Sequence, residues 1–90
     1  MKISNEQIEF FVKANKILQV PSHFPDGNKV LEEYKKIYEE ELKNKKAPYY
    51  RSLSASCGSC IRHCVFTCIN DLRKLKIIDI NGDYINGKDK

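Results

Sequence analysis

The sequence predicts a mainly α protein: a three-helix domain with a C-terminal β-hairpin. Two observations support this fold class. Apolar residues recur with helical spacing along most of the chain, and an alternating apolar pattern surrounds an Asn-Gly pair near the C-terminus. Ninety residues, of which 41% are hydrophobic and 31% charged, suit a single small globular domain over 1–90.

The first helix is predicted over residues 5–18. Ser4 and Gln7 form a capping-box pattern, in which each side chain binds the backbone N–H of the other residue, and Ile3 and Ile8 suit a hydrophobic staple. The connector VPSHFPDGN follows with two prolines and an Asp-Gly pair, so we expect a turn-rich loop there.

A second helix is predicted over 29–46, with apolar residues on one side and Glu and Lys on the other. The polar stretch PYYRSLSAS then offers serine caps for a third helix over 55–76. IIDINGDYI alternates around Asn-Gly, the pair most favoured in two-residue type I′ turns, and predicts a hairpin over 77–86. The tail over 87–90 is expected to fray.

Composition and charge exclude several classes of protein. The formal net charge of +4 gives modest attraction to polyanions. No apolar run approaches the ~18 residues of a membrane span, and the N-terminus lacks the pattern of a secretory signal. No phosphate-binding loop, nucleophile elbow or paired-acid motif is present. We therefore expect a cytoplasmic protein (in the host cytoplasm if it is viral) that is not an enzyme and has no membrane and no small-molecule substrate as partner.

All four cysteines lie in the run SCGSCIRHCVFTC. At about 100° per residue, Cys57, Cys60, Cys64 and Cys68 fall within one helical stripe about 80° wide, and this stripe must also face the core. One interpretation is therefore that reduced thiols pack as small hydrophobic residues. A second is a thiol redox protein that uses the CGSC pair Cys57 and Cys60.

A structural zinc ion is the third interpretation of this run. Cys57 and Cys68 would lie ~16 Å apart along a straight helix, whereas Zn–S bonds are about 2.3 Å, so at most three thiolates can converge. The predicted cofactor is thus either none or one structural zinc, held by Cys57, Cys60 and Cys64. His23 is the proposed fourth ligand, provided that its loop folds over the third helix. An iron–sulfur cluster would lack a suitably placed fourth thiolate.

The order of elements, three helices followed by a hairpin, resembles that of the winged helix-turn-helix family. The stretch that resembles the passage from the recognition helix into the wing of that family is INDLRKLKIIDINGDYING. The resemblance covers the C-terminal part of the chain and implies binding of DNA through the third helix. It places these residues at a groove or near phosphates: Arg62, His63, Thr67, Asn70, Arg73, Lys74, Lys76 and Lys88.

The segment CGSCIRHC is also similar to small, Lys- and Asn-rich tailed-bacteriophage proteins that carry a CGSC-type motif. This resemblance implies a non-enzymatic binding protein: a protein-protein adaptor, a virion accessory protein, a regulator or an inhibitor of a host factor. Phe24, Tyr49 and Tyr50 are the expected anchors for a protein partner, because aromatic residues contribute disproportionately to interfaces. Nucleic acid is slightly preferred over protein as the partner, and the oligomeric state stays open.

Overall fold

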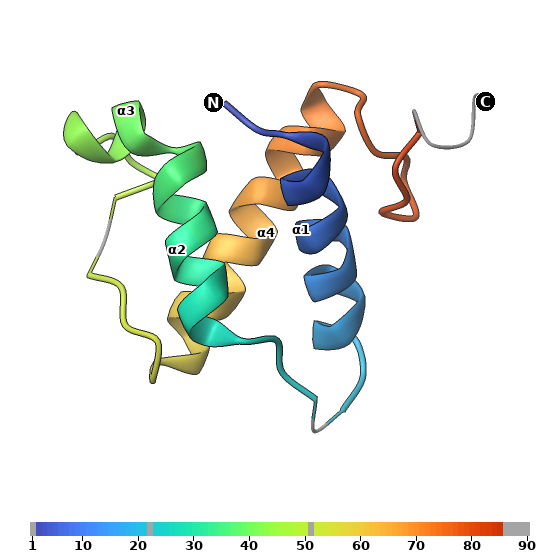
Figure 1. The fold of residues 1–90 in the computed structure, drawn as a ribbon, viewed down its shortest axis with the longest axis horizontal. Helices are drawn as coiled ribbons and strands as arrows, with labels where there is room; N and C mark the ends of the chain where they lie inside the picture. Colours follow the sequence, from blue (N-terminus) through green and yellow to red (C-terminus); the bar gives the residue numbers. More distant parts are fainter. Residues whose placement is uncertain (1, 22, 51, 86–90) are drawn as a thin grey trace.

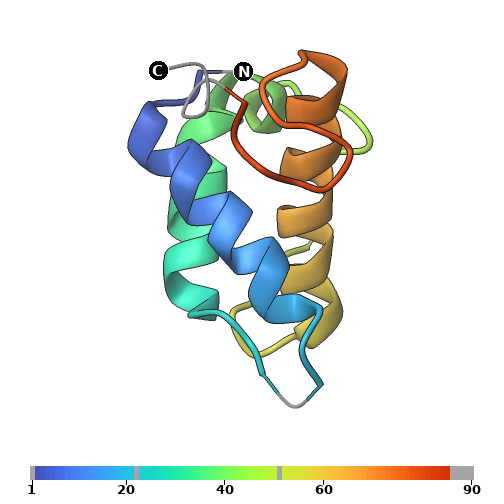
Figure 2. The ribbon, with the colours of Figure 1, turned by 90° about the vertical axis from the view of Figure 1, so that its right-hand side faces the viewer.

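The computed structural model describes residues 2–21, 23–50 and 52–85, which contain four helices. They are α1 (Asn5–Leu18), α2 (Gly27–Ile37), α3 (Glu39–Lys43) and α4 (Gly58–Lys74). The mainly α class is therefore confirmed. The longest helix, α4, packs against both α1 and α2 and lies behind them in Figure 1. Figure 2 shows these two layers from the side. None of the described helices is both long and apolar enough to cross a membrane.

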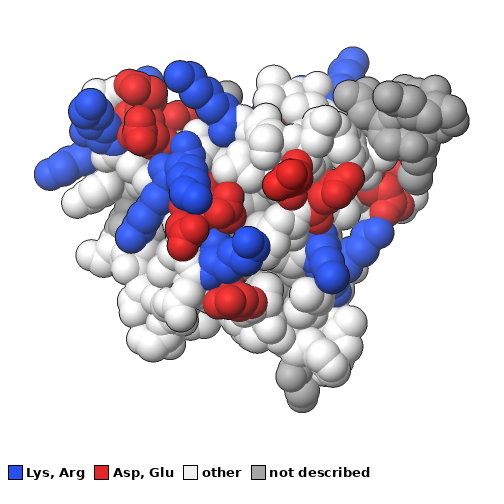
Figure 3. All heavy atoms as spheres, viewed as in Figure 1, with Lys and Arg blue, Asp and Glu red and all other residues white. Residues whose placement is uncertain are grey.

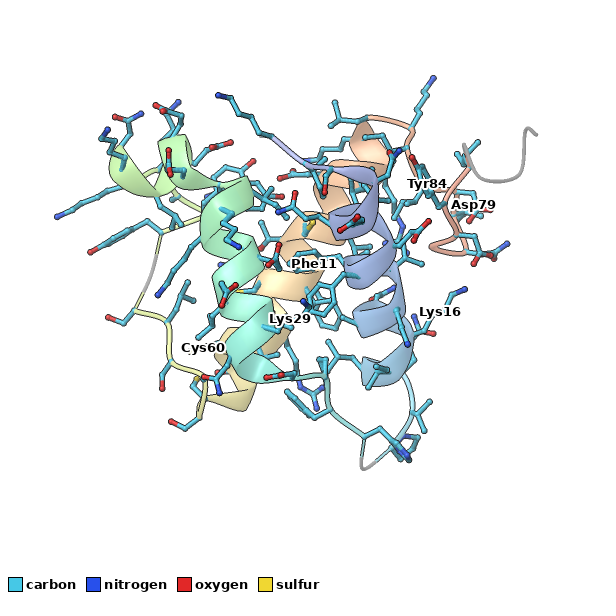
Figure 4. The ribbon with its side chains drawn as sticks, viewed as in Figure 1. Phe11, Lys16, Lys29, Cys60, Asp79 and Tyr84 are labelled. Carbon is cyan, nitrogen blue, oxygen red and sulfur yellow. The ribbon has the colours of Figure 1, made fainter. Side chains whose placement is uncertain are left out.

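α1 has the bounds that the capping box predicts. The Ser4 hydroxyl accepts from the Gln7 N–H at 3.2 Å, and the Gln7 side-chain oxygen accepts from the Ser4 N–H at 2.9 Å. The inner face of the helix buries Ile8, Phe11 and Ala14. Phe11 extends from α1 toward the centre of the molecule, in front of α4 (Figure 4).

The prediction of one continuous helix over 29–46 is wrong, because the chain forms α2 and then α3 with a break at Tyr38. This residue has backbone angles of φ −108° and ψ 30°, outside the helical range. Its side chain is fully buried, and its hydroxyl donates to the Asp71 carboxylate of α4 at 2.8 Å. α2 therefore ends just before the residue whose side chain packs against α4.

α4 begins three residues later than the sequence predicts, because Cys57 caps it and the serines before it do not. Its inner face buries seven residues: Cys60, Ile61, Cys64, Val65, Cys68, Ile69 and Leu72. The expected packing of cysteines as small hydrophobic residues is thus confirmed for the three that lie within the helix. Cys57 is only half-buried.

The predicted hairpin is wrong, because within residues 77–85 only Ile78 and Tyr84 form an isolated bridge. The carboxylate of Asp79 accepts from the backbone N–H groups of Asn81 and Asp83 at 2.9 and 3.0 Å. The turn accordingly starts one residue early, and Ile80 lies at its tip, 88% exposed. Residues 77–85 therefore lack the wing that the winged-helix resemblance implied; the rest of the predicted hairpin and the tail fall outside the described residues.

Instead of forming a ladder, the C-terminal segment 77–85 packs on α1. The Tyr84 hydroxyl donates to the Asn5 side-chain oxygen at 2.7 Å, and Lys16 forms an ion pair with Asp83. Figure 4 shows Tyr84 and Asp79 beside α1. Ile78 completes this contact with a side chain that is 2% exposed. The segment thus closes one end of the core.

Candidate nucleic-acid interface on α4

The side of α4 that faces away from α1 and α2 carries a row of exposed side chains, which we call the α4 outer stripe. Its members are Arg62, Phe66, Asn70, Arg73 and Lys74. The spacing of four residues between Arg62, Phe66 and Asn70 places them in one row on a helix. The acidic residue of α4, Asp71, is half-buried and accepts a hydrogen bond from Tyr38, so the exposed residues of this helix include cations and no acid.

Two hollows flank the stripe, and Phe66 and Asn70 line both of them. On one side the hollow is bordered by Pro48, Tyr49, His63, Thr67, Lys74 and the half-buried acid Asp71. On the other side it is bordered by Arg73 and Ile69 and by two polar residues at the C-terminal end of α1, Asn15 and Gln19. The ring of Phe66 is 43% exposed and stands between the two hollows. The surface therefore combines an aromatic face with polar and cationic edges, and its one acid, Asp71, is hydrogen-bonded to Tyr38.

The loop before α2 positions the first cation of the stripe. The Arg62 guanidinium carbon lies 5.0 Å from the centre of the Phe24 ring, a cation–π contact. The same ring approaches the start of α4, because a Cβ placed on Gly58 would lie 3.6 Å from Phe24 Cζ. The loop thus folds over the N-terminal end of α4 and supports Arg62.

The opposite face of the molecule differs in charge pattern. Figure 3 shows Lys and Arg interspersed with Asp and Glu over α1, α2 and α3. There the Lys36 amine forms ion pairs with Glu32 at 3.3 Å and with Glu33 at 3.5 Å. A hydrogen bond from Gln7, together with Lys36, holds the pKa of Glu33 below its usual value. Positive charge on that face is offset locally, in contrast to the α4 outer stripe.

Most of the predicted DNA-binding residues share this surface. Arg62, Asn70, Arg73 and Lys74 are exposed, and His63 and Thr67 are half-buried at its border. Lys76 is exposed just beyond the helix in a left-handed conformation with φ 60°, and Lys88 lies outside the described residues. Sequence reasoning missed Phe66, although its position four residues from both Arg62 and Asn70 was a signal that could have identified it.

The four predicted zinc ligands are placed differently from one another. Cys57 and Cys60 meet at the start of α4, whereas Cys64 is fully buried in the hydrophobic core. The loop of His23 does fold over α4, but its imidazole is exposed and Nδ1 lies 3.1 Å from the Pro21 carbonyl oxygen. In the part of the chain that the structure describes, no three His, Cys, Asp or Glu side chains gather to hold a metal ion. A zinc site stays a prediction.

The aromatic anchors predicted for a protein partner are separated by the fold. Phe24 is 46% exposed over Arg62, and Tyr50 is 49% exposed, with Lys45 5.5 Å from its ring centre. Tyr49 is half-buried and stacks on Tyr38 at 4.7 Å between ring centres. These three rings therefore serve different local contacts, and a single aromatic patch does not form from them.

Comparisons of the chain with protein-family models, with curated proteins and with solved structures found no match. The resemblance to tailed-bacteriophage proteins accordingly stays a prediction.

Proposed function

We propose that this protein binds DNA through the α4 outer stripe. The observation that carries the proposal is the row of exposed cations on α4, interrupted by an exposed phenylalanine. The one acid of the helix, Asp71, is half-buried and accepts a hydrogen bond from Tyr38. Arg and Lys neutralise phosphates, and that interaction supplies most sequence-independent affinity for nucleic acids. The formal net charge of +4 acts in the same direction.

Phe66 supports single-stranded DNA as the preferred form. An exposed aromatic ring among cations offers a stacking surface for an unpaired base, and such stacking contributes about 1–3 kcal/mol per base. The hollows on both sides of the ring provide space for the neighbouring nucleotides, with Asn70 available to both. Within a duplex the bases are already stacked, so Phe66 would contribute less there.

The test is the fluorescence anisotropy of a labelled oligonucleotide, as a single strand and as a duplex, over a series of salt concentrations. If Arg62, Arg73 and Lys74 each neutralise one phosphate, the slope of log K against log salt should be about −2 for the single strand. Phe66→Ala should weaken single-strand binding by about 5- to 150-fold and duplex binding by less, from the stacking energy above.

A pair of matched variants separates a local site from general charge. Arg73→Ala/Lys74→Ala removes two cations from the stripe, and Lys43→Ala/Lys46→Ala removes two exposed cations on and after α3. The first should reduce the salt slope by about 1.4 and the second should leave it nearly unchanged. Equal effects of both variants, or no binding at 50 mM salt, would contradict the proposal.

A further inference from the structure

The start of α4 brings two thiols of unequal exposure together. Cys57 is the N-cap residue, with extended backbone angles of φ −98° and ψ 107°, and Cys60 is the third residue of the helix. The sulfur of Cys57 accepts from the Cys60 backbone N–H at 3.2 Å and lies 3.3 Å from the Ser59 hydroxyl oxygen. Cys57 is half-exposed, whereas Cys60 is only 4% exposed. A reagent in solvent would therefore meet Cys57 first.

The surroundings of Cys57 stabilise its thiolate. The Cys60 side chain, then hydrogen bonds from the Ser59 hydroxyl and from the backbone N–H of Cys60, lower the pKa of Cys57 to about 7. The Cys60 thiol itself donates to the Ser52 carbonyl oxygen at 3.5 Å. The partial positive charge of a helix N-terminus acts in the same direction. At slightly alkaline pH most Cys57 is then a thiolate, which is the nucleophilic form.

The two remaining cysteines have the opposite character. Cys64 and Cys68 are fully buried in the core. Burial raises the pKa of the Cys68 thiol to about 12. A buried, protonated thiol is inert toward disulfides in solvent. The chain thus separates one accessible pair from two thiols that serve packing.

We propose that Cys57 and Cys60 form a thiol–disulfide exchange site that reduces disulfides of low molecular mass, of the glutathione class. The Cys57 thiolate attacks one sulfur of the disulfide RS–SR, which forms a mixed Cys57–S–S–R bond and releases the first RS⁻. The sulfur of Cys60 then attacks the Cys57 sulfur, and its proton leaves with the second RS group as RSH. The protein dithiol is oxidised to an intramolecular disulfide, and RS–SR is reduced.

The helix start can accommodate the product bond. A disulfide needs Cβ atoms about 3.5–4.5 Å apart, whereas residues three apart within a helix have Cβ atoms about 5–6 Å apart. Because Cys57 is the N-cap, its extended backbone lies outside the helix, and its sulfur already reaches over the Cys60 N–H. Bond formation requires both side chains to rotate, and the Cys60 thiol then leaves its contact with the Ser52 carbonyl oxygen at 3.5 Å. Cys64 and Cys68, both inside α4, lack this freedom.

The experiment treats the reduced 90-residue chain with EDTA and then with excess oxidised glutathione at pH 8. Samples are quenched with acid and unfolded, their free thiols are alkylated, and the protein mass is measured by mass spectrometry. We expect the wild type to lose two hydrogens, to carry no lasting glutathione and to keep two alkylatable thiols, which peptide mapping assigns to Cys64 and Cys68. Cys57 should react at least about 100-fold faster than those two thiols.

Two serine variants assign the roles. Cys60→Ser should trap one glutathione on Cys57, because the resolving thiol is gone. Cys57→Ser keeps a good helix N-cap, so it should fold, and it should react at least about tenfold more slowly than the wild type. Circular dichroism checks that both variants are folded.

Three outcomes would overturn the proposal. They are unchanged reactivity of folded Cys57→Ser, a stable glutathione adduct on the wild type, and equal reaction rates for all four thiols. DNA binding is tested with different variants, at Phe66, Arg73 and Lys74, so either proposal can fail without the other.

Discussion

The side chain of Tyr38 connects three segments of the chain. Its ring centre lies 4.8 Å from that of Tyr34 in α2 and 4.7 Å from that of Tyr49 in the segment after α3. Its hydroxyl donates to Asp71 of α4 at 2.8 Å, and the whole side chain is buried. A buried hydroxyl without a hydrogen-bond partner is costly. The bond to Asp71 therefore stabilises the buried position in which the ring contacts Tyr34 and Tyr49.

Tyr38→Phe should lower the free energy of unfolding by about 1–2 kcal/mol, because it removes a hydrogen bond to a charged acceptor and keeps the ring. Urea denaturation followed by circular dichroism measures the change. Tyr50→Phe is the matched control, since that side chain is 49% exposed, and its effect should stay within about 0.5 kcal/mol. Equal effects at the two positions would argue against the buried hydrogen bond.

Stability should also fall at alkaline pH. Burial raises the pKa of both Tyr34 and Tyr38, and the nearby cysteines Cys64 and Cys68 add to this. In the unfolded chain a tyrosine ionises near pH ~10. Folding therefore holds these phenols neutral, so their contribution is complete below pH ~10 and is lost as the pH rises above it.

The measurement is the urea midpoint at several pH values between 8 and 11.5, together with tyrosinate absorbance. We expect the midpoint to fall above pH ~10, and the slope to be smaller in Tyr38→Phe. Ionisation of all five tyrosines with native circular dichroism retained would contradict the prediction.

Among the elements, α2 and α4 both begin with glycine, but a Cβ atom at the two positions would meet different surroundings. Gly27 is the first residue of α2, and a Cβ there would lie 2.9 Å from the Ala55 carbonyl oxygen. Gly58 is the first residue of α4, and a Cβ there would meet only Phe24, at an ordinary contact distance of 3.6 Å. The close approach between α2 and the segment before α4 thus depends on a glycine at the first site but not at the second.

Gly27→Ala should therefore lower the free energy of unfolding by about 1–3 kcal/mol, as overpacking does, despite the higher helix propensity of alanine. Gly58→Ala is the control at the equivalent position of α4 and should be neutral or stabilising by up to about 1 kcal/mol. Thermal and urea unfolding of the two variants give the comparison. Stabilisation by Gly27→Ala would show that the 52–57 segment can move away.

The elements also differ in how well the sequence predicted them. α1 was predicted with the correct bounds, and its start follows from the capping box, a local interaction of Ser4 with Gln7. The break between α2 and α3 was not, because it coincides with burial of Tyr38 against Asp71, thirty-three residues away. The turn after Ile78 starts one residue earlier than predicted. The reason is that the Asp79 carboxylate binds the N–H groups of Asn81 and Asp83, which competes with the expected Asn-Gly turn.

At the scale of the whole molecule, the C-terminal segment completes the core. Ile78 is 2% exposed and belongs to the same cluster as Phe11 of α1 and Leu72 of α4. The segment binds α1 through a hydrogen bond from Tyr84 to Asn5 and an ion pair between Asp83 and Lys16. Since the segment joins both layers, loss of its apolar contact should weaken the whole fold and not only its end.

Ile78→Ala should cost about 2–4 kcal/mol and lower Tm by roughly 10 °C or more, from the usual effect of truncating a core residue in a domain of this size. Far-UV and near-UV circular dichroism should change in one transition. Ile80→Ala, two residues further on and 88% exposed, is the control and should stay within about 0.5 kcal/mol. Separate transitions in Ile78→Ala would mean that the segment unfolds on its own.

The helical class, the bounds of α1 and the inward stripe of cysteines in α4 could all be predicted from the amino-acid sequence, because each depends on residues within a few positions of one another. Packing between elements sets where α2 ends, the lack of a wing in residues 77–85, and the shared exposure of Arg62, Phe66 and Asn70. It also made Cys57 the accessible thiol and Cys60 its buried neighbour. These features depend on which face of each helix is covered, and contacts between distant parts of the chain set that.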